Sequence, residues 1–154
     1  MSDDPVRSAA STPEVLHAII VDAFNRGDVD AFIAAHEADA TVAVPPDGRL
    51  VHGLDAIRAA TAPIFALHPH LTITVYRKLQ TDDLALTRAH WKLAGVAGDG
   101  SPVHLNGNGT IVSRRRPDGT WGVVLDDPLG ADQEPAGAAA AGPPPAATET
   151  PGPT

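Results

Sequence analysis

The sequence predicts a single α+β domain in which a cone-shaped, curved antiparallel sheet wraps around three N-terminal helices. Three observations support this fold class. Apolar residues recur at helical spacing as far as Phe65, turn signals then separate four strand-like runs, and 154 residues suffice for one hydrophobic core. Because a bent sheet does not close completely on short helices, we also expect a pocket between them.

Two helices joined at a glycine are predicted first. Thr12 is a suitable N-cap, and Pro13 fits the first turn of a helix. Gly27 ends this helix, and Asp28 caps a second, shorter one. The apolar stripes comprise Val15, Leu16, Ile19, Ile20, Ala23 and Phe24 on the first helix, and Val29, Phe32, Ile33 and His36 on the second.

A small hairpin and a third helix follow. Residues 40–44 and 50–52 predict two short strands around a turn at 45–48, which contains two prolines and an Asp-Gly pair. Asp55 is expected to open the third helix, which extends through Phe65 and which Pro63 can shorten.

The second half of the chain predicts four strands. Residues 71–79, 84–96, 103–115 and 121–125 form the runs, and turns rich in Asp and Gly separate them. In the second run, alternation directs one set of side chains toward the helices and the other set outward. The inward set is Ala85, Thr87, Ala89, Trp91 and Leu93, and the outward set is Arg88, His90 and Lys92.

Both ends of the chain are expected to lie outside the folded domain. Residues 131–154 are mostly Ala, Pro and Gly, so they cannot bury enough surface to offset their ordering entropy. We therefore expect a disordered lead at 1–11, a domain at 12–130 and a disordered tail at 131–154. The lead has no signal-peptide or anchor pattern, so a cytoplasmic location is expected by default.

Charge and composition exclude several classes of partner. A formal net charge of -8 repels phosphate backbones and anionic lipids, so neither a nucleic acid nor a membrane is expected to bind. The absence of cysteine excludes disulfides, thiolate nucleophiles and iron–sulfur clusters. Because the segment His68-Pro69-His70 has no carboxylate nearby in sequence, no metal is expected, and no cofactor motif is present.

Three stretches of the sequence carry a resemblance to a known superfamily. They are residues 26–30 leading to 38–42, residues 52–57, and the run from 117 to 121 that ends in Asp126-Asp127-Pro128. Their order and spacing resemble the nuclear transport factor 2-like, or ketosteroid-isomerase-like, cone folds, particularly the SnoaL-like members. The resemblance implies a cystatin-like α+β barrel with a pocket, and a homodimer that we expect to form through the outer sheet face.

The isomerase mechanism of that superfamily does not carry over to this sequence. It needs a carboxylate base and two acids, a tyrosine and a protonated aspartate. The resemblance places Val44 at the base and Ile20 at the tyrosine, with Thr110 or Ile111 at the second acid. An apolar side chain cannot accept a proton, although the pocket itself can persist.

Two other residues are candidate catalytic groups. His36, on the inner face of the second helix, resembles a pocket-adjacent tyrosine of the isomerases; the alternative is a core histidine bonded to a backbone carbonyl. Asp126 is opposite in phase to Trp121, and the resemblance places that phase toward the cavity, where desolvation would raise its pKa. The alternative is that Asp126 caps the strand end before Pro128.

Further residues are candidate ligand contacts. Trp91 offers a flat stacking surface beside small side chains, or belongs to the plain core. In the third strand either face can point inward: the Asn face would supply amide donors, whereas the Gly face would allow the sheet to bend. The predicted ligand-binding set is Ile20, Phe24, Val44, Phe65, Thr87, Trp91, Asn106 and Asn108.

Two functions of different class follow. The first is a cofactor-free enzyme that uses His36 and Asp126 for isomerisation, cyclisation or hydration of an apolar, polyketide-like or terpenoid-like substrate. The second is a non-catalytic ligand-binding or dimerisation module, in which the face bearing Arg88, His90 and Lys92 pairs with a second copy.

Overall fold

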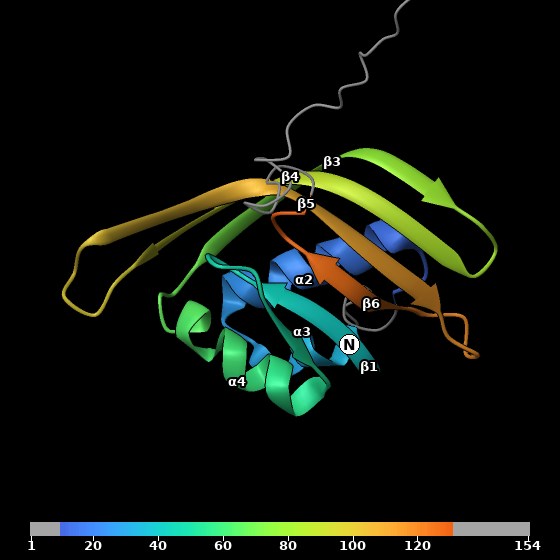
Figure 1. The fold of residues 1–154 in the computed structure, drawn as a ribbon, viewed down its shortest axis with the longest axis horizontal. Helices are drawn as coiled ribbons and strands as arrows, with labels where there is room; N and C mark the ends of the chain where they lie inside the picture. Colours follow the sequence, from blue (N-terminus) through green and yellow to red (C-terminus); the bar gives the residue numbers. More distant parts are fainter. Residues whose placement is uncertain (1–9, 131–154) are drawn as a thin grey trace, which may run out of the picture.

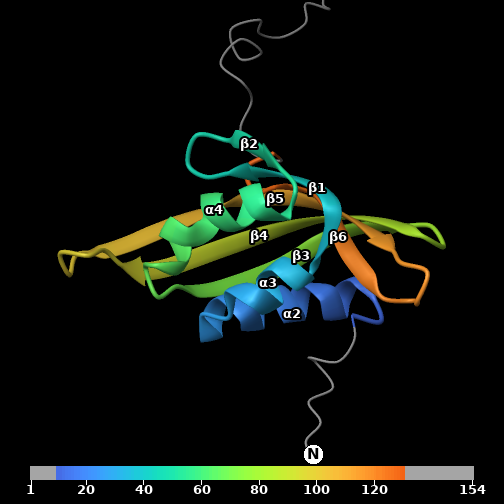
Figure 2. The same cartoon turned by 90° about the horizontal axis from the view of Figure 1, so that it is seen from below.

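The computed structural model describes residues 10–130, in which one curved sheet carries three helices against its inner face (Figures 1 and 2). The predicted tail at 131–154 and most of the predicted lead at 1–11 lie outside the described residues. In chain order the elements are α2 (Pro13–Arg26), α3 (Val29–Ala34), β1 (His36–Val44), β2 (Arg49–His52), α4 (Leu54–Phe65), β3 (His70–Gln80), β4 (Leu84–Val96), β5 (Pro102–Arg115) and β6 (Trp121–Asp127).

The six strands lie in the order β2-β1-β6-β5-β4-β3. This arrangement confirms the predicted α+β class and the curved sheet, and strands β3 to β6 form the expected antiparallel meander. The sheet is nevertheless mixed, because β1 pairs with β6 in parallel. It is also open rather than closed as a barrel, since β2 and β3 are its two edges.

The helix ends follow local signals in the sequence. The Thr12 side chain accepts a hydrogen bond from the Val15 N–H at 3.1 Å and caps α2. Gly27 adopts a left-handed conformation with φ 70°, which ends the helix, and Asp28 caps α3 through the Ala31 N–H. Pro63 lies inside α4, yet the helix reaches Phe65 as predicted.

The prediction that His36 lies on the second helix is wrong. Helix α3 ends at Ala34, and His36 is the first residue of β1. The chain turns here because tertiary contacts satisfy its backbone: the Val123 N–H donates to the Ala35 carbonyl at 2.8 Å, and Arg116 donates to the carbonyls of Ala34 and His36 at 3.1 and 3.2 Å. The spacing of apolar residues in the sequence cannot predict these long-range contacts.

Three phenylalanines form the aromatic part of the core. The rings of Phe24 and Phe65 stack with centroids 4.7 Å apart, and Phe32 meets Phe24 edge to face at 4.9 Å. Such pairs stabilise a fold by about 1 kcal/mol beyond their area of burial. The cluster connects α2, α3 and α4 and so fixes the helices over the sheet.

A partly buried ion pair connects β1 to the β5–β6 hairpin. The Arg116 Nε donates to Glu37 Oε2 at 2.5 Å, and the two side chains are only 26% and 15% exposed. Gly122 leaves room for this pair, because a Cβ at that position would lie 2.5 Å from both Arg116 Nη2 and Glu37 Oε2. The absence of a side chain at Gly122 therefore allows the ion pair that holds β6 beside β1.

We predict that Gly122→Ala lowers the free energy of unfolding by about 1–3 kcal/mol, because the new methyl group must displace a partly buried ion pair. Urea denaturation measures this change. The matched control is Gly98→Ala, where an added Cβ meets nothing within 4 Å. Equal stabilities for the two variants would show that the ion pair moves aside without cost.

Candidate ligand-binding site

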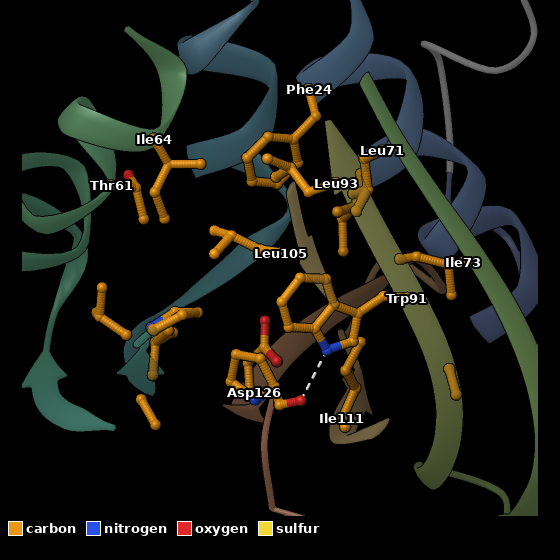
Figure 3. Close-up of a pocket in the computed structure, with 18 of the residues that line it drawn as sticks. Phe24, Thr61, Ile64, Leu71, Ile73, Trp91, Leu93, Leu105, Ile111 and Asp126 are labelled. Carbon is orange, nitrogen blue, oxygen red and sulfur yellow. Dashed lines mark hydrogen bonds between the residues drawn. The ribbon is translucent and has the colours of Figure 1, made fainter. Parts of the chain in front are cut away.

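A cavity of about 100 Å³ lies between the helices and the inner face of the sheet (Figure 3). Helices α2, α3 and α4 and strands β1, β3, β4, β5 and β6 all contribute to its lining. Among residues 10–130, only two lining residues have polar side chains other than the Trp91 indole, namely Thr61 and Asp126. Figure 3 shows Phe24 and Asp126 at opposite ends of the cavity.

Two of the polar groups in the lining are already bonded. The Thr61 hydroxyl donates to the Ile57 carbonyl at 2.8 Å, and the Trp91 Nε1–H donates to the Pro128 carbonyl at 2.7 Å (Figure 3). Asp126 has no hydrogen-bond or ion-pair partner within residues 10–130. The cavity therefore offers a ligand one free polar side chain, and that side chain is a carboxyl group.

A β-bulge turns Asp126 toward the cavity. Ser113 pairs with Val123 and Ile111 pairs with Asp126, so Val124 is an extra residue in β6. Trp121 and Asp126 consequently point to the same face of the sheet. The prediction that Asp126 faces the cavity is confirmed by the lining, but the predicted opposite phase to Trp121 is wrong, because regular alternation does not survive the bulge.

Burial raises the pKa of Asp126 to about 7, and repulsion from the neighbouring Asp127 adds to the effect. The residue is half-buried, but its register partners are the apolar Val42 on β1 and Ile111 on β5. Desolvation is the larger cause because no cationic side chain lines the cavity to stabilise the charged form. Near neutral pH the carboxyl group therefore exists in both protonation states.

The positions that resemble the isomerase acids and base belong to the apolar wall. Ile20, Val44 and Ile111 all line the cavity. Thr110, the alternative position for the second acid, pairs with Arg88 and points to the outer face. The positions that the resemblance assigns to the isomerase base and acids therefore carry apolar side chains toward the cavity or, at Thr110, point away from it.

The predicted contact residues are distributed over three environments. Ile20, Phe24, Val44 and Trp91 line the cavity. Phe65 lies behind them and stacks on Phe24. Thr87 faces inward as predicted, but its hydroxyl lies 3.1 Å from His17 Nε2 and belongs to the buried core.

The two asparagines of β5, which were predicted as ligand contacts, do not line this cavity. Leu105, Gly109 and Ile111 supply the β5 part of the lining, which fixes the phase that the sequence left open. Asn106 pairs with the outward Lys92, and Asn108 is hydrogen-bonded to His90 on the outer face. The glycine face points inward, where Pro128 and Leu129 approach the strand so closely that a Cβ on either glycine would clash with them.

His36 lies outside the cavity lining. It is 3% exposed, its Nδ1 lies 2.8 Å from the Phe32 carbonyl, and its ring meets the Phe32 ring edge to face. Burial lowers the pKa of His36, which keeps the imidazole neutral near pH 7. This arrangement corresponds to the alternative of a core histidine bonded to a backbone carbonyl.

Sequence reasoning missed one part of the cavity lining, Pro128, which lies in the segment directly after β6. We name residues 128–130 the C-terminal wall. A Cβ on Gly109 would lie 2.8 Å from Pro128 Cα, and a Cβ on Gly107 would lie 2.8 Å from Leu129 Cδ2. The two glycines thus seat the wall against the sheet, and the Trp91 hydrogen bond holds it there. In the sequence, the alternating pair Gly107 and Gly109 was the signal that could have indicated a close backbone approach here.

The part of the chain from 10 to 130 contains no helix long and apolar enough to cross a membrane. Within the same residues, no group of three or more His, Asp or Glu side chains is placed to hold a metal ion.

The family model of the SnoaL-like domain matches residues 19–121, which is more than half of the chain. The chain therefore belongs to the SnoaL-like domain family. A search of curated proteins finds no match.

Similar solved structures share the fold. A ketosteroid isomerase-like protein from Erwinia carotovora atroseptica is 19% identical, with a TM-score of 0.65 over 76% of this chain and 92% of that chain. A proposed aromatic ring hydroxylase from Novosphingobium aromaticivorans is 24% identical, with a TM-score of 0.67 over 82% and 89%. A proposed dehydratase of the NTF2-like family from Streptomyces avermitilis is 18% identical, with a TM-score of 0.61 over 73% and 89%.

We predict that Gly109→Ala displaces the C-terminal wall. The new Cβ would meet the backbone of Pro128, and a backbone cannot rotate away as a flexible side chain can. The expected results are an overpacking cost of about 1–3 kcal/mol and faster solvent exchange of the Trp91 indole proton as its bond to Pro128 breaks. Amide and indole hydrogen exchange by NMR measures this, with Trp121 as the internal reference. Unchanged exchange at Trp91 would contradict the seating.

Proposed function

We propose that this protein binds an apolar small molecule in the cavity and transfers a proton to or from it through Asp126, without a cofactor. The observation that carries the proposal is a single carboxyl group that faces an apolar cavity and has no partner among residues 10–130. A group whose pKa lies near the working pH exchanges protons at little cost in either direction. His36 is not part of the proposal, because it lies outside the lining.

The two protonation states of Asp126 have complementary roles. The acid form donates to an oxygen of the ligand, and the ionised form accepts a proton from an acidic carbon or from a water molecule. Because the lining contains no second acid or base, one carboxyl group must carry out both steps. Isomerisation, cyclisation and hydration of a polyketide-like or terpenoid-like molecule are reactions in which a single group can give and recover a proton.

The similar solved structures carry names of several different activities. The names of the similar structures refer to ketosteroid isomerase, ring hydroxylation and dehydration, which are different reactions on one fold. The chemistry must therefore be argued from this chain's own cavity.

Proton exchange into a bound ketone tests the proposal without knowledge of the natural substrate. We expect the protein to accelerate deuterium incorporation next to the carbonyl of cyclohexanone in D₂O, and Asp126→Asn to lose at least about a hundredfold of that acceleration. NMR follows the incorporation. The matched control is Asp127→Asn, which removes the adjacent exposed carboxylate and its repulsion but leaves the Asp126 carboxyl group in place. Equal rates in all three proteins would refute proton transfer by Asp126.

The pH dependence of stability gives an independent prediction. The pKa of Asp126 rises from 3.8 to about 7 on folding, so the folded state holds the extra proton between these values. The contribution of Asp126 to the free energy of unfolding is therefore greatest below about pH 4, and it is lost as the pH rises toward 7. We expect Asp126→Asn to be more stable than the parent by about 2–4 kcal/mol at about pH 8, and nearly equal at about pH 4. Urea denaturation at both pH values checks this, and a difference independent of pH would contradict it.

A second proposed role, homodimerisation through the outer sheet face, is favoured by an aliphatic row across four strands. Leu79 pairs with Leu86, Leu86 with Val112, and Val112 with Leu125, so four side chains form one line on the outer face. Leu79 is 52% and Leu125 is 49% exposed. Arg88, His90 and Lys92 lie exposed on the same face, as predicted. Lines of exposed aliphatic residues commonly mark an association surface.

We predict that the parent protein sediments as a dimer and that Leu125→Lys sediments as a monomer, because a lysine in the row would be desolvated on association. Sedimentation velocity over a range of concentrations gives the answer. Leu50→Lys is the matched control, since Leu50 is 70% exposed on β2 and lies outside the row. A parent that stays monomeric at high concentration would refute this role.

A further inference from the structure

The cavity offers a ligand one polar group, the carboxyl group of Asp126, among residues 10–130. Thr61 and the Trp91 indole are occupied by the carbonyls of Ile57 and Pro128, so neither is free to bind a ligand. Every other side chain of the lining, apart from Asp126, is hydrocarbon or absent. A ligand with several polar groups would leave all but one of them without a partner, at a cost of about 1–3 kcal/mol each.

The charges around the cavity disfavour anions. No Lys, Arg or His of the described part of the chain lines it. Asp127 is the charged group that acts on Asp126, and it is also an acid. Farther along β5, Arg114 lies within 4 Å of both Glu37 and Asp39, so its charge is balanced locally. An anionic ligand would therefore be desolvated beside two carboxyl groups with no cation to offset the cost.

The space available corresponds to about one ring. The cavity volume is about 100 Å³, which is smaller than the engineered apolar cavity of about 150 Å³ that admits benzene, so one ring is the most that can lie wholly inside it. The aromatic cluster closes the end near Phe24, and the C-terminal wall bounds the cavity near Asp126. Neither boundary can move without displacing core side chains or the seat at Gly109.

From these three features we infer that the ligand is a compact, neutral molecule of about one ring with a single hydrogen-bond-accepting oxygen, such as a ketone, ether or epoxide, and that the oxygen lies against Asp126. This inference rests on the proposed function in one respect, the role of Asp126 as the polar contact. It adds the charge, size and polar count of the substrate class, and it favours a small terpenoid-like molecule over a polyketide-like one, whose several oxygens would lack partners.

Four cyclohexane derivatives test the inference because they share one ring and differ in one substituent. They are cyclohexanone, methylcyclohexane, cyclohexylamine and cyclohexanecarboxylate. We expect cyclohexanone to bind about fivefold more tightly than methylcyclohexane at about pH 5.5, which corresponds to one net hydrogen bond. That advantage disappears at about pH 8.5, where the ionised carboxylate no longer donates. The carboxylate ligand is expected to bind at neither pH. Ligand-observed NMR titrations give the dissociation constants.

Two variants serve as matched controls for the polar contact. Asp126→Asn keeps the shape and an N–H donor but cannot ionise, so the preference for cyclohexanone should persist at both pH values. Asp126→Leu removes the donor, so cyclohexanone and methylcyclohexane should bind equally. The NMR spectrum of each variant establishes that it is folded before titration.

Three results would overturn the inference. Cyclohexylamine that binds most tightly, and more tightly as the pH rises, would define an amine site instead. Equal binding of cyclohexanone and methylcyclohexane to the parent would show that the oxygen is not recognised. Failure of all four rings to bind would show that the cavity takes a larger ligand or none.

The proposed function fails by a different measurement. If the rings bind in the expected order but deuterium exchange into cyclohexanone is the same in the parent and in Asp126→Asn, the substrate class stands and proton transfer by Asp126 does not.

Discussion

A carboxyl group that lies beside an apolar cavity without a cationic partner is costly to ionise, because the charged form loses its water and gains nothing in exchange. In this fold Asp126 is held in that position by β1 on one side and β5 on the other. The carboxyl group responds by keeping its proton to a higher pH, which raises its pKa to about 7. Both the proposed chemistry and the preference for a neutral ligand follow from this one constraint.

The empty space beside Asp126 depends on small residues where the sheet bends. Ala89 and Gly109 pair across β4 and β5, and both line the cavity. On the helix side the space ends at the stacked rings of Phe24 and Phe65. A bulky side chain at Ala89 or Gly109 would fill the hollow or lift the C-terminal wall, so the cavity is maintained by backbone-to-backbone approach as much as by the helices.

The sequence predicted those features that depend on neighbouring residues. The caps at Thr12 and Asp28, the glycine stop at Gly27 and the alternation of the 84–96 strand all appear in the structure. Features set by distant contacts were not predicted. The side chain of Arg116 helps to end α3 before His36. The bulge at Val124 reverses the phase of β6, so Asp126 faces the cavity on the same face as Trp121, not on the opposite face as regular alternation predicts. The sequence did not decide which face of β5 points toward the cavity, because the glycine face is set by its contact with the C-terminal wall.

The most direct test of the account is the titration of the Asp126 carboxyl carbon, followed by ¹³C NMR in the ligand-free protein and assigned with Asp126→Asn. A midpoint near pH 7 is the predicted result, since desolvation beside the apolar cavity favours the protonated form. A midpoint near the ordinary value of 3.8 would mean that water solvates the carboxylate, and it would contradict both the apolar environment and the chemistry derived from it.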